Sequence, residues 1–270
     1  MVRALHQLHD DAPKILDDPI VVRLVDPEGE AYKRVVAALA SDPGQTRFRA
    51  NWVMRNRYAE DCLAESLARG VRQYVVLGAG LDTFAYRQPA WARSIQIFEV
   101  DYPPTQVWKR NKLNSVNITL PDNLTLVPVD FEKTSIKEGL ARAGFDFGVP
   151  TFFSSLGVTQ YLTSEALDLT FEFVLSLPKA SEIVFSFVLA DSELTSDEAA
   201  VTALHAAGAA ERGEPWFSRF IPQQLISKLR SMGFSKVVHF SSEDANDRYF
   251  KRRRDGLEAW KLEQMMRAGV

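Results

Sequence analysis

The chain has 270 residues, of which 46% are hydrophobic and 25% are charged, a balance typical of a globular protein of enzyme size. Its formal net charge of -3 excludes the strong long-range attraction to nucleic acid or acidic membranes that a basic protein has. A single cysteine, Cys62, excludes an intramolecular disulfide and a cysteine-cluster metal site.

The sequence contains no apolar stretch that approaches the roughly 20 residues of a membrane span, and its start lacks a long apolar segment. We therefore expect a cytoplasmic protein that acts on a small molecule and has neither nucleic-acid nor membrane partners. No metal is expected, and the sequence leaves the oligomeric state open.

The first part of the chain, residues 1–70, carries many charges at helix-like spacing and is interrupted by prolines. This texture predicts an N-terminal helical cap that ends in a helix over 51–69. From residue 71 onward, short apolar segments alternate with helical patterns, which predicts a parallel sheet with right-handed crossovers. The five predicted strands are 73–77, 95–100, 124–129, 149–155 and 182–189.

The C-terminal part of the chain completes the prediction of an α/β, Rossmann-like domain over 71–270. A helical insertion is expected near 190–222, followed by a helix that begins at Pro222. The strand 236–240 and the segment around Tyr249 are then expected to close a mostly parallel seven-stranded sheet as antiparallel strands.

The first predicted strand ends in VVLGAGLDT (75–83), where Gly78, Ala79 and Gly80 form a turn. Glycines at the carboxyl end of a parallel strand let the backbone turn tightly and pass close to a ligand. A dinucleotide fingerprint requires a third glycine where this chain has Thr83, and a phosphate-binding loop is absent. The turn therefore favours a nucleoside ligand without a pyrophosphate and disfavours a nicotinamide dehydrogenase.

The next two predicted strands also end in acidic residues. Asp101 follows Gly78 by 23 positions, close to the spacing at which an acid meets ribose hydroxyls; Glu99, on the same side of the strand, is the competitor. Asp130 ends the third strand, where a carboxylate can reach an adenine amino group or simply cap the next helix. Together with the glycine turn, these acids indicate S-adenosylmethionine.

Six stretches then carry a family resemblance: RNRYAEDCL, GVRQYVVLGAGLDTFAYR, FEVDYPPTQVWKR, VPVDF, LGVTQYLTSEAL and GEPWFSRFIPQQL. They span roughly residues 50 to 235, and the chain resembles the leucine carboxyl methyltransferase-like family of S-adenosylmethionine-dependent methyltransferases, in particular its bacterial branch of small-molecule O-methyltransferases. The resemblance implies a class I methyltransferase fold, with S-adenosyl-L-methionine as cofactor and S-adenosyl-L-homocysteine as product.

The resemblance also implies roles for individual residues. Arg55 matches an arginine that pairs with the cofactor's carboxylate, with Arg57 as the alternative on the other side of the helix. Gly78 matches the glycine-turn contact and Asp101 the ribose acid, while Asp130 with Phe131 matches the adenine edge.

One departure concerns the stretch after the fourth predicted strand, where the family commonly has a glutamate before Gly-Val. This chain has Leu156 at that position, so the glutamate's contact is lost or replaced, with Ser154 and Ser155 as the candidates. The departure motivates an alternative hypothesis, in which the protein binds the cofactor but is catalytically weak or inactive.

The four histidines form no recognisable catalytic constellation, so we seek the methyl acceptor's site in the cap and in the insertion. Tyr161 is expected near the methyl-transfer position. Trp216 and Arg219 suit the wall of an apolar pocket with one cation, although core packing also explains them, and Trp52 and Tyr58 are candidates for a lid. The main hypothesis is O-methylation of a small-molecule hydroxyl or carboxyl group.

Overall fold

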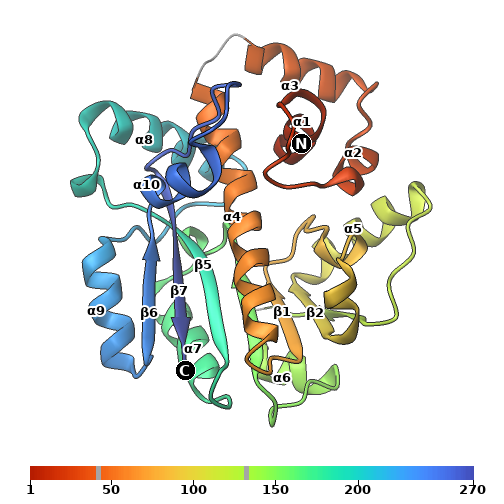
Figure 1. The fold of residues 1–270 in the computed structure, drawn as a ribbon, viewed down its shortest axis with the longest axis vertical. Coiled ribbons are helices and arrows are strands. Elements are labelled where there is room, and N and C mark those ends of the chain that lie inside the picture. The colour runs from red at the N-terminus through yellow and green to blue at the C-terminus, as the bar shows by residue number, and fades with distance from the viewer. Residues whose placement is uncertain (41–43, 131–133) are drawn as a thin grey trace.

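A computed structural model describes residues 1–40, 44–130 and 134–270. Its centre is a seven-stranded sheet in the order β3-β2-β1-β4-β5-β7-β6, with helices on both faces (Figure 1). The strands are β1 (Gln73–Leu77), β2 (Gln96–Asp101), β3 (Leu124–Pro128), β4 (Thr151–Ser155), β5 (Glu182–Val188), β6 (Lys236–Phe240) and β7 (Glu263–Gly269).

Strands β1 to β5 are parallel, and β7 runs antiparallel to both β5 and β6. The order reverses at β1, which pairs with β2 on one side and β4 on the other. In such a sheet, ligands bind beyond the carboxyl ends of the strands at the reversal. The predicted Rossmann-like class and mostly parallel seven-stranded sheet are confirmed.

The two faces of the sheet pack against different helices because side chains alternate along each strand. Tyr74 and Val76 of β1 point to the face that is covered by α4 (Gly44–Leu67), whereas Val75 and Leu77 point to the opposite face. The helices that cover this opposite face are α6 (Ile136–Arg142), α7 (Ser164–Leu175) and α9 (Pro222–Met232).

The N-terminal helices α1 (Val2–His9), α2 (Pro19–Val25) and α3 (Glu30–Ala40) precede α4 and gather at one end of the sheet (Figure 1). The remaining helices are α5 (Pro103–Ser115), α8 (Ser196–Glu211) and α10 (Ser242–Ala245), with short 3-10 turns at 84–86, 90–94, 159–161 and 191–193. The predicted helix over 51–69 is the carboxyl part of α4. The predicted insertion contains α8.

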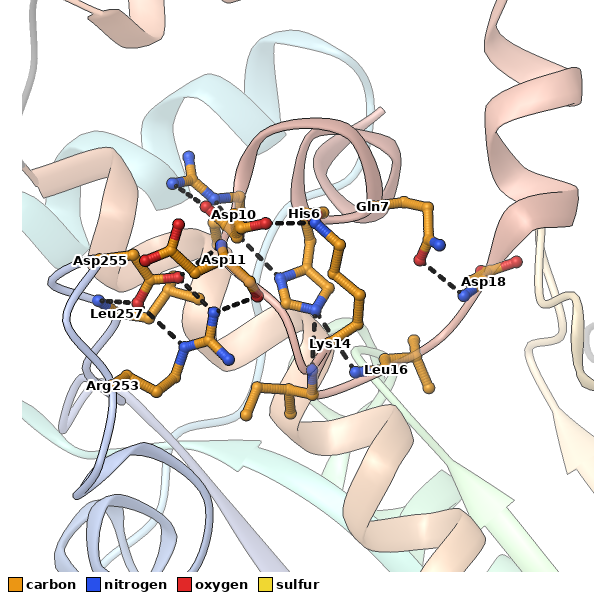
Figure 2. A network of polar contacts seen from close by, with 12 residues as sticks. His6, Gln7, Asp10, Asp11, Lys14, Leu16, Asp18, Arg253, Asp255 and Leu257 are labelled. Atoms are coloured by element: carbon orange, nitrogen blue, oxygen red, sulfur yellow. Dashed lines mark hydrogen bonds and ion pairs between the residues drawn. The ribbon is translucent and has the colours of Figure 1, made fainter.

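A buried polar network holds α1 against α4 (Figure 2). His6 is fully buried, and its Nε2 accepts a hydrogen bond from the Ile15 N–H at 3.1 Å, so Nδ1 carries the proton and donates to Asp10 at 2.7 Å. Arg49 of α4 donates to both oxygens of the same carboxylate. Burial alone would raise the pKa of Asp10, but the hydrogen bonds from His6 and Arg49 outweigh it and lower that pKa.

A second link joins the N-terminal segment to the chain just before β7 (Figure 2). Arg253 donates to the Asp11 carbonyl at 2.8 Å and pairs with Asp255, which accepts from the Asp11 N–H at 3.0 Å. Burial opposes ionisation of Asp255, but the bonds from Arg253 and the backbone prevail and lower its pKa to about 2. The N-terminal segment and the segment that precedes β7 are therefore tied together by charge-assisted bonds.

The prediction that the segment around Tyr249 forms a strand is wrong. Residues Asn246–Phe250 form a π-helix, and the second antiparallel strand is β7. The sequence of β7, EQMMRAG, conceals this role because it carries Glu263 and Arg267, yet both side chains are buried in ion pairs. Arg267 donates to Glu182 on the neighbouring β5 at 2.8 Å.

Candidate cofactor site

The glycine turn follows β1 at the reversal point of the sheet. Gly78 and Gly80 have φ angles of 67° and 46°, a left-handed conformation that glycine adopts without strain. A Cβ on Gly78 would lie 2.5 Å from Val158 Cγ2, so the turn packs closely against the chain that follows β4. The N–H groups of Gly78 and Ala79 both donate to the carbonyl of Val100. These contacts join the ends of β1, β2 and β4 at one place.

The carboxylate of Asp101, the last residue of β2, is held by backbone donors on both sides. Its Oδ2 accepts from the Gly80 N–H at 2.5 Å, and its Oδ1 accepts from the Tyr102 N–H at 2.6 Å. Each oxygen retains a second acceptor direction. The predicted ribose acid therefore lies against the glycine turn.

Glu99, the competitor for the ribose role, is fully buried and is bound by Lys109 of α5 at 2.6 Å. Burial raises the pKa of Glu99, and the ion pair with Lys109 opposes this rise. Gln106 donates to the Glu99 backbone carbonyl at 2.7 Å. Glu99 thus attaches α5 to β2, whereas Asp101 is the acid that lies at the glycine turn.

A cavity of about 440 Å³ opens beside the glycine turn on the α6–α7 face. Gly78, Ser155 and residues 134–137 contribute to its lining, together with the apolar side chains of Leu162, Phe171, Phe173 and Phe185. Asp130 precedes this segment, and its carbonyl accepts from the Thr134 N–H at 2.8 Å. The predicted adenine contact Phe131 lies outside the described residues.

Arg55 projects from α4 to the turn after β4. A Cβ on Gly157, whose φ is 70°, would lie 2.6 Å from a guanidinium nitrogen of Arg55. Its side chain is buried, stacks 4.2 Å from the centre of the Trp52 ring, and pairs with Glu263 at 2.9 Å. Arg57 is exposed and pairs with Asp61 instead, so of the two arginines only Arg55 faces the end of the sheet.

The two serines proposed as substitutes for a glutamate at position 156 face opposite sides of the sheet. Ser154 is fully buried and shares a hydrogen bond of 2.8 Å with the Tyr74 hydroxyl, which makes it part of the core. Ser155 lines the cavity beside Gly78. Leu156 packs with the apolar cluster under α4. Ser155 therefore lies at the cavity, whereas Ser154 is not among its lining residues in the described part of the chain.

Trp216 and Arg219, two of the predicted acceptor residues, belong to a segment that is bound to the 3-10 turn containing Tyr161. The N–H of Phe217 donates to the Gln160 carbonyl at 2.7 Å, which places the segment of Trp216 beside this turn. Arg219 lies 5.9 Å from the centre of the Trp216 ring and pairs with Asp191. The predicted cation is therefore already neutralised by an acid of the insertion.

The lid prediction divides between its two residues. Trp52 is half-buried and lies next to Phe48, whose ring stacks on His205 of α8 at 4.8 Å. This stack brings α4 and the insertion into contact near Arg55. Tyr58 is buried and stacks on Phe240 at 4.1 Å, so its assignment to a lid is wrong: it belongs to the core.

A polar network behind the glycine turn was not predicted. Thr83 is fully buried and donates to Asp18 at 2.7 Å, while Arg3 donates to the Thr83 hydroxyl and to the Leu81 carbonyl. The N-terminal helices thereby contact the turn itself. The one sequence signal was the threonine at a position where a dinucleotide site requires glycine.

Comparisons with known proteins agree with this geometry. A family model described as leucine carboxyl methyltransferase matches residues 1–175. YktD of Bacillus subtilis (strain 168), a candidate S-adenosyl-L-methionine-dependent methyltransferase, is 36% identical over 288 residues, covering 96% of this chain and 91% of that protein. A candidate enzyme of the same description from Mycolicibacterium smegmatis is 33% identical over 178 residues, or 62% of this chain and 58% of that protein.

Among solved structures, a candidate methyltransferase from Thermobifida fusca YX superposes with a TM-score of 0.56 at 17% identity, covering 89% of this chain and 88% of that one. At this identity the likeness concerns the fold. Fold and site define a Rossmann-like methyltransferase that uses S-adenosyl-L-methionine. The chain belongs to the leucine carboxyl methyltransferase family.

None of the helices in the described part of the chain is long and apolar enough to cross a membrane.

Proposed function

We propose that this protein transfers the methyl group of S-adenosyl-L-methionine to an oxygen atom of a small-molecule acceptor. The observation that carries the proposal is the meeting of three strand ends. Gly78 packs on Val158, Asp101 accepts from Gly80, and Arg55 lies against Gly157. These groups suit a nucleoside with an amino-acid tail: Asp101 would bind the ribose, and Arg55 would bind the carboxylate of the tail.

The residues at this edge fit the cofactor's chemistry. The Nε of Arg55 is buried and has no hydrogen-bond partner among the described residues, so the guanidinium retains a donor for a carboxylate. The space that a Cβ would fill at Gly78 and Gly157 is taken up by neighbouring groups, so the backbone lies close to them. The cavity beside Gly78 offers an apolar surface for the adenine ring near Asp130.

S-adenosyl-L-methionine supplies a methyl group on a sulfonium, which an acceptor oxygen attacks with a lone pair as the carbon–sulfur bond breaks and leaves its electron pair on sulfur. The role of the chain is to bind and align, and alignment contributes up to about 7–11 kcal/mol in favourable cases. A carboxylate is already ionised near neutral pH, whereas a hydroxyl acceptor must give its proton to a base.

Three histidines are engaged elsewhere, which supports an acceptor that ionises by itself. His6 is bound to Asp10, His9 hydrogen-bonds Tyr32 at 3.0 Å, and His239 hydrogen-bonds a glutamine of β7. We accordingly favour a carboxylate or an acidic hydroxyl as the methylated group. Its binding site would lie between Trp52, Tyr161 and Trp216, with Arg219 available to an anionic acceptor only if it leaves Asp191.

Calorimetry with S-adenosyl-L-homocysteine tests the cofactor site. Asp101→Ala removes a charged hydrogen-bond acceptor, and loss of such bonds, about 1.5–3 kcal/mol each, predicts affinity roughly 10–100-fold weaker. Asp122→Ala, a change of the same kind at an exposed position, serves as the control. Equal affinities of both variants and the unmodified protein would contradict the assignment of Asp101.

The acceptor class is tested by incubating the protein with radiolabelled cofactor and small molecules that bear carboxyl or hydroxyl groups. Label released by mild alkali identifies a methyl ester, while alkali-stable label identifies an ether. Tight cofactor binding without any labelled product would instead favour a protein that binds the cofactor and does not turn it over. A cytoplasmic location and the absence of nucleic-acid or membrane partners stay predictions.

A further inference from the structure

A buried ion pair lies beside Gly157, in the turn that follows β4. It joins Arg55 of α4 to Glu263, the first residue of β7, through a bond of 2.9 Å from Nη1 to Oε1. Only 9% of Arg55 and 8% of Glu263 is exposed. Burying two charges costs free energy that their mutual attraction repays only when the remaining hydrogen-bonding groups are also satisfied.

The pair does not satisfy all of its groups internally. A guanidinium has five N–H donors, and within the described ranges Arg55 uses one of them, on Nη1, to bind Glu263. Its Nε is buried without a hydrogen-bond partner in the described part of the chain. The Trp52 ring covers one face of the guanidinium but accepts no conventional hydrogen bond. Arg55 thus has donor capacity for a further anion.

The pair is also adjacent to the glycine turn. Gly78 meets Val158, the next residue back is Gly157, and the space above Gly157 is filled by the guanidinium of Arg55. The turn that packs on Gly78 therefore also carries the glycine against which Arg55 lies. Glu263 is bound to the same guanidinium, at 2.9 Å.

We infer that Arg55 and Glu263 together hold an α-amino acid zwitterion, in which Arg55 binds the carboxylate and Glu263 binds the ammonium group. A cation and an anion held side by side complement the two opposite charges that an amino acid carries on one carbon. Glu263 thereby supplies the carboxylate that is missing at position 156, where the family commonly has a glutamate and this chain has Leu156. The inference rests on the proposed function because it places the methionine end of the cofactor at this pair.

The test combines one substitution with three ligands. Glu263→Gln keeps the shape of the side chain and removes its charge. Calorimetry compares S-adenosyl-L-homocysteine, its analogue without the amino group, and 5′-methylthioadenosine, which lacks the whole amino-acid part. We expect the substitution to lower the affinity for S-adenosyl-L-homocysteine roughly tenfold or more, in line with loss of a charged hydrogen bond. Affinities for the two analogues should change less than about threefold.

Controls separate this effect from a general loss of structure. Glu258→Gln changes an exposed glutamate and should leave the affinities for all three ligands unchanged. If Glu263→Gln does not fold, Glu263→Asp serves instead, because it keeps the charge on a shorter side chain. It should lower the affinity for S-adenosyl-L-homocysteine more than the affinity for the analogue without the amino group. An equal loss of affinity for all three ligands would show that the pair only braces α4 against β7 and would overturn the inference. Failure of the unmodified protein to bind S-adenosyl-L-homocysteine would contradict the proposed function instead.

Discussion

Substitution of Gly78 by alanine tests the geometry on which the site depends. An L-residue in the left-handed region costs roughly 1–2 kcal/mol, and Gly78 has a φ of 67°. The new Cβ would also lie 2.5 Å from Val158 Cγ2, and crowding of this kind adds about 1–3 kcal/mol. Gly78→Ala should therefore destabilise the fold by about 2–5 kcal/mol.

Gly80→Ala is the matched control, because Gly80 has a φ of 46° but no heavy atom within 4 Å of the added Cβ. It should cost only the backbone term, roughly 1–2 kcal/mol. Val158→Ala removes the methyl group that collides with the new Cβ. In urea unfolding, Gly78→Ala combined with Val158→Ala should be more stable than the sum of the single changes predicts, by about 1–3 kcal/mol. Equal losses for Gly78→Ala and Gly80→Ala, or strict additivity with Val158→Ala, would refute the close packing of the turn.

Three further predictions concern buried ionisable groups. Glu99→Gln leaves Lys109 as an unpaired buried charge and should cost about 3–5 kcal/mol in urea unfolding, most of which Lys109→Met restores; no restoration would contradict the pairing. Burial raises the pKa of Cys62 to about 12, so a thiol reagent should label it only in denaturant, and rapid labelling of the native protein would show an accessible thiol. The lowered pKa values of Asp10 and Asp255 contribute stability above about pH 4 that is lost as pH falls toward 2, and Asp255→Asn should flatten this acid slope in thermal unfolding.

The sequence was sufficient to predict the elements that bury apolar side chains in regular patterns. QYVVL is β1 residue for residue, and its glycine turn lies at the carboxyl end of a parallel strand, as predicted. Asp101 was placed correctly at the end of β2, next to the turn. These features are local: they depend on the spacing of residues within one strand and its following loop.

Features that depend on contacts between distant residues were missed. The sequence of β7 looks polar because it contains Glu263 and Arg267. The strand can nevertheless be buried because partners far away in the sequence neutralise both charges: Glu182 pairs with Arg267, and Arg55 pairs with Glu263. A buried charge cannot be distinguished from a solvated one before its partner is known. The same limit explains Tyr58, whose place in the core depends on Phe240, a residue of β6.

The N-terminal helices do more than cover one end of the sheet. Arg3 and Asp18 bind Thr83, which follows the glycine turn, and α4 places Arg55 against Gly157 in the turn after β4. The His6–Asp10 contact and its neighbours in Figure 2 hold the same helices to the end of the chain. Residues 1–18 therefore brace the glycine turn through the bonds of Arg3 and Asp18 to Thr83 and of Arg3 to the Leu81 carbonyl. The first helices and the glycine turn therefore form one packed unit.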